Sequence, residues 1–419
     1  MSQSASNQTR VLFRNADVFD GESKTLKKAM NVMVVGDQIA EVSSQLIPAN
    51  GAEQIDCTGK VLMPGLIDNH VHVFVNSMNV SPPEPPMSYR AQYANKFLGH
   101  ILSCGFTSVR DVAGGDQGIA MALRDGFMVG PRYFYGGPAL SQTGGHADFR
   151  AEGKEDLCPC CSGNGNTKIG VIADGEDECR KAARENLRQG ANHIKIIASG
   201  GVLSQSDPID KLQYTAGEIS AIVEECDRRG VYACAHCHPA AAVRRCVECG
   251  VRCIEHGTLI DAPTAGFVAE KGAFVVPTMA VIFAMLEDGP KMGLTQTSYD
   301  KLLSIKDVAL QGLEIMKREG VKMGFGTDLL GPQHVRQGTE FTLRKQVLSA
   351  ADILISATSI NADILQMKDK LGVVKKGAYA DLLVVDGNPL DKIELLAANG
   401  AHLTHIMLKG AFVKRPSMH

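Results

Sequence analysis

Two histidines separated by one residue, His70 and His72, close an apolar run that begins at Val61. On a β-strand, side chains alternate between two faces, so both imidazoles point to one side while Val71 packs on the other. Two imidazoles on one rigid face can bind the same metal ion. Such a pair also occurs on strands that bind nothing, so its meaning depends on the residues that accompany it.

Four further residues that can do metal chemistry stand in or at the end of short apolar runs, namely Lys195, His236, His256 and Asp328. Lys195 lies within the apolar run 194–197, where burial disfavours its charged form. A neutral amine reacts with carbon dioxide to give a carbamate, whose two oxygens can bridge two cations. Taken alone, Lys195 could be an amine at a strand end and His256 a core histidine. Together, the six residues predict one metal site if the fold brings their runs together.

The elements that would position these residues alternate between strand and helix. Expected strands span residues 66–72, 107–112, 132–135, 193–198, 231–236, 252–256, 274–277 and 322–328. Helical spacing of apolar residues covers 177–189, 216–229, 240–249 and 299–319. Eight strands with intervening helices predict an α/β fold, a (β/α)8 TIM barrel, whose active site lies at the C-terminal ends of the strands. The six residues stand in or close to such ends.

Both ends of the chain differ from this pattern. Residues 11–19, 31–35, 38–42, 381–386 and 405–414 are expected to be strands joined by glycine-rich turns. We expect these segments to form one small β-sandwich built from the N- and C-terminal parts of the chain. The expected domains are 1–63 for the first half of the sandwich, 64–366 for the catalytic barrel and 367–419 for the second half.

Composition limits the classes of partner. A net charge of −3 without blocks of one sign argues against a nucleic-acid or membrane-surface partner. The first ten residues are polar and no apolar run approaches about 18 residues, so we expect no signal peptide and no membrane span. In a chain of 419 residues, the 12 cysteines are expected to remain thiols in a reducing cytoplasm.

The cysteines offer a second metal hypothesis. Two groups have metal-like spacing, Cys246, Cys249 and Cys253, and Cys158, Cys160 and Cys161. The first group spans a helix and the start of a strand, which disfavours a cluster. The second lies in a glycine-rich loop, where it could cover the mouth of the site, form a disulfide or bind an adventitious metal.

The sequence resembles the amidohydrolase superfamily over nearly its whole length. The resemblance is carried by residues 64–72, Lys195, His236, His256, 326–328 and 372–386. It implies a barrel with an appended β-sandwich and a pair of zinc ions. One zinc would be held by His70, His72 and Asp328, the other by His236 and His256, and carbamylated Lys195 would bridge both.

A closer resemblance is to the branch of Xaa-Pro dipeptidases and ochratoxin-hydrolysing amidohydrolases, carried by residues 143–148, 195–201 and 213–215. It implies that His146 or Tyr214 polarises the scissile carbonyl or holds a substrate carboxylate, although Tyr214 could instead pack within its loop. His238, two residues after His236, is expected to contact the substrate. Arg110 and Arg150 are further candidates for binding a carboxylate, and Arg110 could instead pair with Asp111.

The implied function is hydrolysis of an amide bond by a metal-bound hydroxide, with Asp328 accepting its proton and passing it to the leaving amine. The expected substrate is a small amide that releases an amino acid with a free carboxylate, such as ochratoxin A, an N-acyl amino acid or a dipeptide. A Xaa-Pro dipeptidase proper and a hydrolase of phenylureas or thiocarbamates remain alternatives. Lys195 counts against a deaminase, and the complete ligand set counts against a noncatalytic assembly protein. The resemblance also favours a homo-oligomer, for example an octamer.

Overall fold

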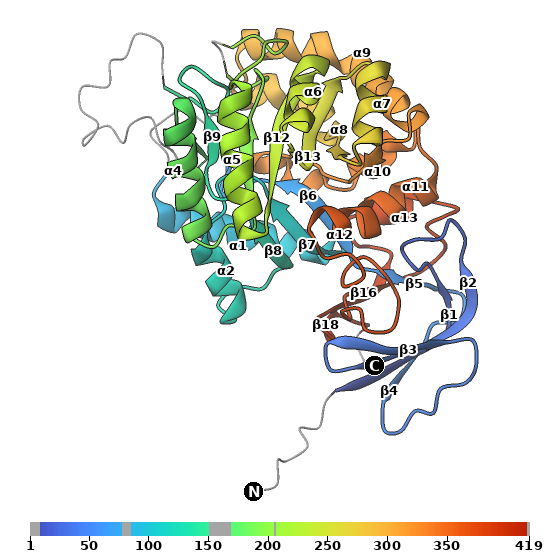
Figure 1. Ribbon diagram of the computed structural model, residues 1–419. Helices are drawn as coiled ribbons and strands as arrows, with labels where there is room; N and C mark the ends of the chain where they lie inside the picture. The colour runs from blue at the N-terminus through green and yellow to red at the C-terminus, as the bar shows by residue number, and fades with distance from the viewer. Residues whose placement is uncertain (1–8, 78–84, 151–168, 205–206, 417–419) are drawn as a thin grey trace, which may run out of the picture.

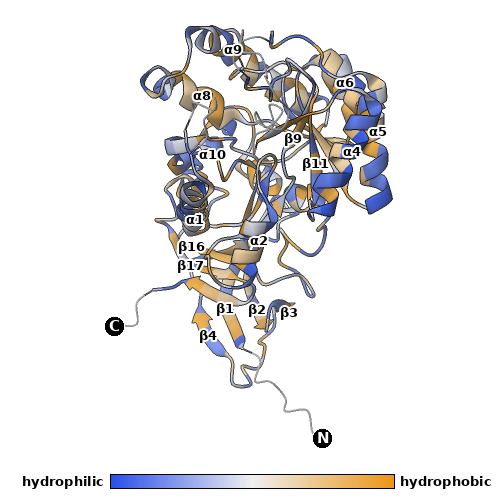
Figure 2. Cartoon of the chain, turned by 90° about the vertical axis from the view of Figure 1, so that its left-hand side faces the viewer, coloured by the Kyte–Doolittle hydropathy of each residue, from blue (hydrophilic) through white to orange (hydrophobic). Residues whose placement is uncertain are grey.

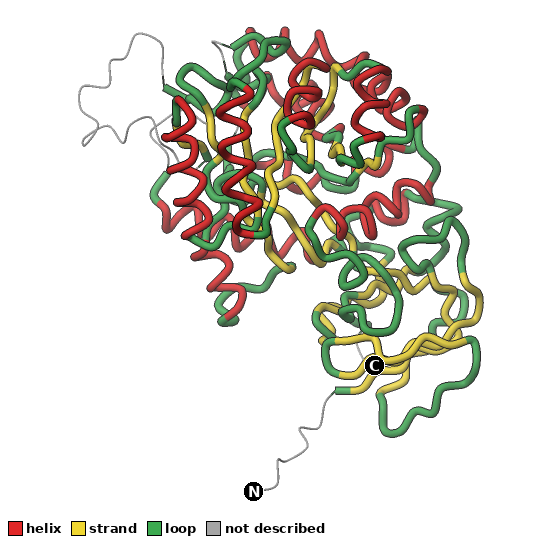
Figure 3. Tube along the Cα trace, in the orientation of Figure 1, coloured by secondary structure: helices red, strands yellow, loops and turns green. Residues whose placement is uncertain are grey.

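The computed structural model describes residues 9–77, 85–150, 169–204 and 207–416. Its larger part is a barrel of parallel strands surrounded by helices, and its smaller part is a sheet to which both chain ends contribute strands (Figure 1). Figure 3 shows the helices in red around the yellow strands of the barrel, with the smaller sheet below them. Within the described ranges, no helix combines the length and the apolar character needed to cross a membrane.

Eight strands build the barrel, as the sequence predicts. They are β6 (Leu66–Val71), β7 (Phe106–Asp111), β8 (Arg132–Tyr135), β11 (His193–Ile197), β12 (Tyr232–Pro239), β13 (Cys253–Leu259), β14 (Phe274–Val276) and β15 (Lys322–Met323). Each strand pairs in parallel with the next in two series, β6, β7 and β8, and β11, β12, β13, β14 and β15. Backbone hydrogen bonds complete the circle. Asn192 N donates to Tyr135 O over 2.8 Å, and Asn69 N donates to Phe325 O over 2.9 Å.

Several strands depart from the expected bounds. β12 and β13 each continue three residues past their expected ends at 236 and 256. The last strand was expected over 322–328 but has regular pairing only at β15. The segment after it still bonds to both neighbours, because Gly324 N donates to Val275 O and Asp328 N donates to His70 O, each over 2.8 Å. In addition, β9 (Ala139–Ser141) and β10 (Gly170–Ile172) form a short parallel pair beside β11 that the sequence analysis did not identify.

The four helices expected from the sequence are present as α4 (Gly175–Arg188), α5 (Ala216–Arg229), α6 (Ala240–Glu248) and α9 (Gln296–Arg318). The remaining helices and helical turns are α1 (Met87–Ser103), α2 (Gln117–Arg124), α7 (Ala262–Glu270), α8 (Met279–Asp288), η2 (Gly289–Met292), η3 (Gly331–Arg336), α10 (Thr339–Arg344), α11 (Ala350–Ile355), η4 (Ser356–Ile360), α12 (Asn361–Ile364) and α13 (Glu394–Ala397). Figure 2 shows α4 and α5 as largely hydrophilic and α8 as largely hydrophobic. The hydrophilic helices α4 and α5 cover the outside of the barrel, whereas α8 is mostly buried.

The smaller sheet joins the two ends of the chain. It contains β1 (Arg10–Val18), β2 (Lys27–Val35), β3 (Gln38–Ser43), β4 (Glu53–Asp56), β5 (Val61–Pro64), β16 (Leu382–Val385), β17 (Leu403–Leu408) and β18 (Ala411–Lys414). β5 pairs in parallel with β1 and antiparallel with β16, so it links strands from both termini. Buried side chains of β1, β2, β5 and β16 form one apolar cluster in this part. Its arrangement as a two-layered sandwich stays a prediction.

Candidate active site

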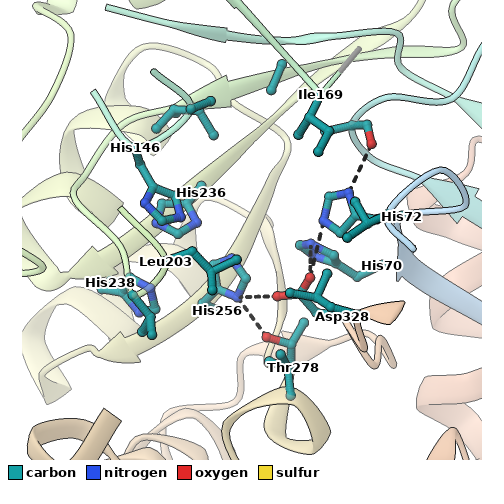
Figure 4. A pocket seen from close by; sticks show the side chains of 18 of the residues that line it. His70, His72, His146, Ile169, Leu203, His236, His238, His256, Thr278 and Asp328 are labelled. Carbon is teal, nitrogen blue, oxygen red and sulfur yellow. Dashed lines mark hydrogen bonds and ion pairs between the residues drawn. The ribbon is translucent and has the colours of Figure 1, made fainter. Parts of the chain in front are cut away.

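The six residues that the sequence predicts to bind metal line a single cavity at the C-terminal ends of the barrel strands. They are His70, His72, Lys195, His236, His256 and Asp328. β6 supplies His70 directly and His72 just beyond its end, and Asp328 follows β15. Figure 4 shows five of these side chains directed toward one another from opposite sides of the cavity.

The tightest group within this set consists of His70, His256 and Asp328. One ligand atom of each lies within 4.8 Å of the others. Asp328 Oδ1 is 3.4 Å from His70 Nε2 and 3.2 Å from His72 Nε2. Two imidazoles and a carboxylate at this spacing form a donor set that suits a divalent transition metal. Among the described residues, this is the group of histidine, cysteine and acidic side chains that is compact enough to hold a metal ion.

Two of these residues have unusual backbone conformations. His256 has φ of 72° and Asp328 has φ of 54°, a left-handed region that non-glycine residues rarely adopt. Such strain costs roughly 1–3 kcal/mol and concentrates at functional sites. Close packing also explains the glycine two residues before Asp328. A Cβ on Gly326 would lie 2.7 Å from the Cβ of His70, closer than real Cβ contacts allow.

Hydrogen bonds fix the orientation of the histidine rings. His70 Nδ1–H donates to Glu255 Oε2 over 2.8 Å, and His72 Nδ1–H donates to the carbonyl of Ala113 over 3.0 Å. Both bonds leave Nε2 as the unprotonated nitrogen that faces the cavity. His236 is arranged in the opposite way, because its Nε2–H donates to the carbonyl of Gly200 over 3.1 Å. Its Nδ1 is therefore the nitrogen left for a ligand.

Burial sets the charge of these side chains. Burial lowers the pKa of His70 to about 4 against the opposing charge of Asp328, and it lowers the pKa of His236 and His256 well below the usual range. Burial alone would raise the pKa of Asp328, but the neighbouring His70 and His72 lower it overall. His72 differs, because burial lowers its pKa but the hydrogen bond and charge of Asp328 raise it overall. Neutral imidazoles at His70, His236 and His256 next to an ionised carboxylate are the protonation states that metal binding requires.

The cavity also contains His146 and His238, which the sequence analysis places near the substrate. His146 Nδ1 is 2.6 Å from Ser204 Oγ, and its ring stacks on that of His236 with 4.6 Å between centroids. The His238 ring stacks on that of His256 at 5.0 Å, and its Nδ1 is 3.1 Å from Thr258 Oγ1. Both imidazoles thus lie next to the predicted ligands.

Three other candidates lie elsewhere. Tyr214 is buried in the core and donates from its hydroxyl to the carbonyl of Ala173 over 2.9 Å, so the structure does not bring it to the cavity. Arg150 pairs with Asp148 at 2.6 Å. Arg110 is fully buried, and its guanidinium binds Glu255 rather than Asp111.

The cysteine hypothesis gains no support in the described part of the chain. The thiols of Cys246, Cys249 and Cys253 are free and belong to no group there that could hold a metal. Cys158, Cys160 and Cys161 lie outside the described residues.

The sequence analysis missed three polar residues that contact the site: Glu255, Thr278 and Ser204. Glu255 could have been noticed, because an acidic residue inside a buried strand needs a cation or a hydrogen-bond donor. Thr278 Oγ1 lies 2.7 Å from His256 Nδ1. It follows the apolar run 274–277, yet nothing in the sequence distinguishes it from an ordinary strand-end threonine.

Apolar side chains form much of the cavity wall away from the histidines. Helices α8 and α9 contribute five of them, Val281, Ile282, Met285, Leu302 and Ile305. Among the described lining residues, Lys195 and Asp328 are the ones with an ordinarily charged side chain, apart from the histidines. The cavity therefore combines a polar floor with a largely apolar wall.

Comparisons with known proteins agree with this arrangement. Residues 61–413 match the model of the amidohydrolase family. Ochratoxinase of Aspergillus niger is 31% identical over 416 residues, which cover 95% of this chain and 85% of that protein. The crystal structure of a prolidase complexed with N-methylphosphonate-L-proline superposes with a TM-score of 0.93 at 42% identity, covering 97% of this chain and all of that one.

A Xaa-Pro dipeptidase with methionine bound in its active site superposes with a TM-score of 0.86 at 28% identity, again covering 97% of this chain and 100% of the other. The family match includes every barrel strand and each of the six predicted ligands. The chain therefore belongs to the amidohydrolase family and is a hydrolase that acts on carbon–nitrogen bonds.

Proposed function

We propose that the protein hydrolyses an amide bond that releases an amino acid with a free carboxylate, using two zinc ions bridged by carbamylated Lys195. The observation that carries this proposal is the convergence of six ligand-type residues in one cavity that also contains His146 and His238. The proposed catalytic unit is the barrel at residues 64–366, flanked by sandwich halves at 1–63 and 367–419.

The residues fit two metal ions. His70, His72 and Asp328 would hold one, and His236 and His256 would hold the other. Lys195 would lie between them; it is 3% exposed and its neighbours Ile194 and Ile196 are fully buried. Bound there, divalent ions would lower the pKa of a shared water and polarise the scissile carbonyl.

The chain's own side chains would move the proton and hold the substrate. The Asp328 carboxylate, ionised and exposed to the cavity, would accept a proton from the attacking water and deliver it to the leaving nitrogen. His146 and His238 would donate hydrogen bonds to the carbonyl oxygen or to the carboxylate of the departing amino acid. Ser204 and Thr258 fix the orientation of these two rings.

Two considerations support an amino-acid amide as substrate. The similar proteins include an ochratoxinase, a prolidase and a Xaa-Pro dipeptidase, whose names denote ochratoxin and dipeptides. The apolar side chains of α8 and α9 suit a hydrophobic acyl group or side chain, since removing an apolar group of leucine size from water is favourable by roughly 1.5–3 kcal/mol.

A substrate screen with the zinc-loaded protein tests the proposal. The panel contains ochratoxin A, N-acyl amino acids and Xaa-Pro dipeptides, with a phenylurea and a thiocarbamate as competitors. We expect hydrolysis of at least one amide and release of the free amino acid, detected by chromatography. Cleavage of the phenylurea or thiocarbamate alone, by protein that holds its metal, would contradict the proposed substrate class in favour of that alternative.

A further inference from the structure

A buried ion pair lies next to His70. Arg110 on β7 and Glu255 on β13 are both fully buried, and Arg110 Nη2 donates to Glu255 Oε1 over 2.7 Å. The other oxygen, Oε2, accepts from His70 Nδ1 over 2.8 Å. One carboxylate therefore joins a guanidinium and an imidazole, using a separate oxygen for each.

Arg110 also holds the strand that carries this histidine. Its Nε donates to the carbonyl of Asn69 over 2.7 Å, one residue before His70. The backbone before His70 and the ring of His70 are thus fixed by the same pair, through Arg110 and through Glu255 respectively. Such a double attachment restricts both the position of the strand and the rotation of the ring.

The pair is needed for the charge of the carboxylate. An unpaired carboxylate in the barrel interior would be strongly disfavoured. The Arg110 guanidinium at 2.7 Å supplies the cationic partner that such a carboxylate needs. Both oxygens of Glu255 are therefore used, one by Arg110 and the other by His70.

Two other predicted histidine ligands have an uncharged partner at Nδ1. His72 donates to the Ala113 carbonyl, and His256 meets the Thr278 hydroxyl. A carboxylate partner pushes more electron density into the imidazole than a carbonyl or hydroxyl does, which makes that imidazole a stronger ligand. The Nδ1 of His70 therefore bonds to a carboxylate, whereas the Nδ1 of His72 and of His256 does not.

We propose that Glu255, held in place by Arg110, is a positioning residue that fixes the His70 ring and strengthens it as a metal ligand. This inference rests on the proposed function in one respect, namely that His70 binds metal. Neither Arg110 nor Glu255 contacts the reacting atoms, so their effect reaches the reaction through His70.

The barrel offers a matched control for the test. Arg344 and Glu340 form a second fully buried pair, with Arg344 Nε donating to Glu340 Oε1 over 2.5 Å. Glu340 accepts a further bond from Ala280 N, so this pair bonds to backbone where the first bonds to a histidine. Glu340→Gln therefore weakens a comparable buried pair without touching His70.

The experiment measures zinc affinity by competition with a chromogenic chelator, alongside thermal unfolding of each variant. Glu255→Gln keeps the side-chain volume but removes the charge, and we expect a 10- to 100-fold loss of affinity for one of two ions. Glu340→Gln is expected to lose stability but to bind both ions as the wild type does. Glu255→Asp keeps the charge but shortens the side chain by one methylene group, which moves the carboxylate away from His70. We therefore expect this variant also to bind zinc more weakly than the wild type.

Three outcomes are informative. Zinc affinity of Glu255→Gln equal to that of the wild type would overturn the inference, as would an equal loss in Glu340→Gln. If Glu255→Gln does not fold, Glu255→Asp decides, and unchanged affinity in that variant would overturn the inference. Failure of the proposed function can be distinguished from failure of this inference, because in that case the wild type itself would bind less than one equivalent of zinc.

Discussion

Asn361 is the residue whose replacement we expect to disturb the site most strongly from outside it. Its Nδ2 donates to the carbonyls of Ile67 and Phe325 over 2.7 and 2.8 Å, and its Oδ1 accepts from Phe325 N over 3.0 Å. The side chain is fully buried. It therefore bridges β6, which carries His70, and the segment that leads to Asp328.

The cost of Asn361→Ala follows from these bonds. The substitution removes three hydrogen bonds. The Phe325 carbonyl keeps its bond from Asn69 N, so the Ile67 carbonyl and the Phe325 N–H are the groups that lose a partner, each worth roughly 1–3 kcal/mol. A water entering the vacated space would recover part of this. We expect a loss of about 2–4 kcal/mol in the free energy of unfolding. We also expect weaker zinc binding, because the strand of His70 and the segment of Asp328 are then joined by their backbone hydrogen bonds without the Asn361 side chain.

Urea unfolding of the metal-free protein and chelator competition measure the two effects. Asn186→Ala is the control, because Asn186 also donates to two backbone carbonyls, those of Gly136 and Pro138, but does not bridge the segments that carry His70 and Asp328. It should lose stability and retain zinc affinity. A loss of less than about 1 kcal/mol in Asn361→Ala, or zinc affinity equal to that of the control, would show that the side chain does not hold these two segments together.

Three further predictions concern other parts of the molecule. Lys301 on α9 donates to three carbonyls of the loop beside the cavity, those of Gly201, Ser204 and Asp207. Lys301→Met should therefore raise KM more than it lowers kcat, and steady-state kinetics showing a fall in kcat alone would contradict this. Gly326→Ala would place a Cβ 2.7 Å from the His70 Cβ. It should lower Tm and zinc affinity together, and melting curves identical to wild type with and without zinc would be the opposing result. Although burial raises its pKa, hydrogen bonds from Ser23, Glu22 and Lys27 lower the pKa of Asp20 to about 2. The stability that this carboxylate adds should be present above about pH 4 and lost as pH falls toward 2. The difference in unfolding free energy between wild type and Asp20→Asn, measured by urea titration, should therefore shrink over that range. A constant difference would contradict this prediction.

Much of the barrel could be predicted because parallel strands in a closed barrel are buried on both faces and appear as short apolar runs. The runs at β6, β12 and β13 end in residues whose chemistry is plain from their type. The last strand was harder, since residues 324–328 bond to both neighbours without regular pairing. The pair β9 and β10 was missed because three-residue strands carry too few side chains to show a period.

Side-chain contacts beneath the site were the part that the sequence did not reveal. Strand alternation places adjacent residues on opposite faces, so Glu255 and His256 should not approach the same site. The positive φ of His256 breaks this alternation, and the sequence does not encode it visibly. Tyr214 shows the converse. A tyrosine in a loop can point into a cavity or into the core, and here its hydroxyl bonds to the carbonyl of Ala173 in the core.

The most direct test of the central claim is the metal content of the purified protein, measured by mass spectrometry for the wild type and for Lys195→Ala under the same zinc supply. We expect two equivalents of zinc per chain in the wild type and a loss of at least one in Lys195→Ala, because the bridging carbamate can no longer form. Less than one equivalent in a wild-type protein that hydrolyses amides, or an unchanged two in Lys195→Ala, would contradict it.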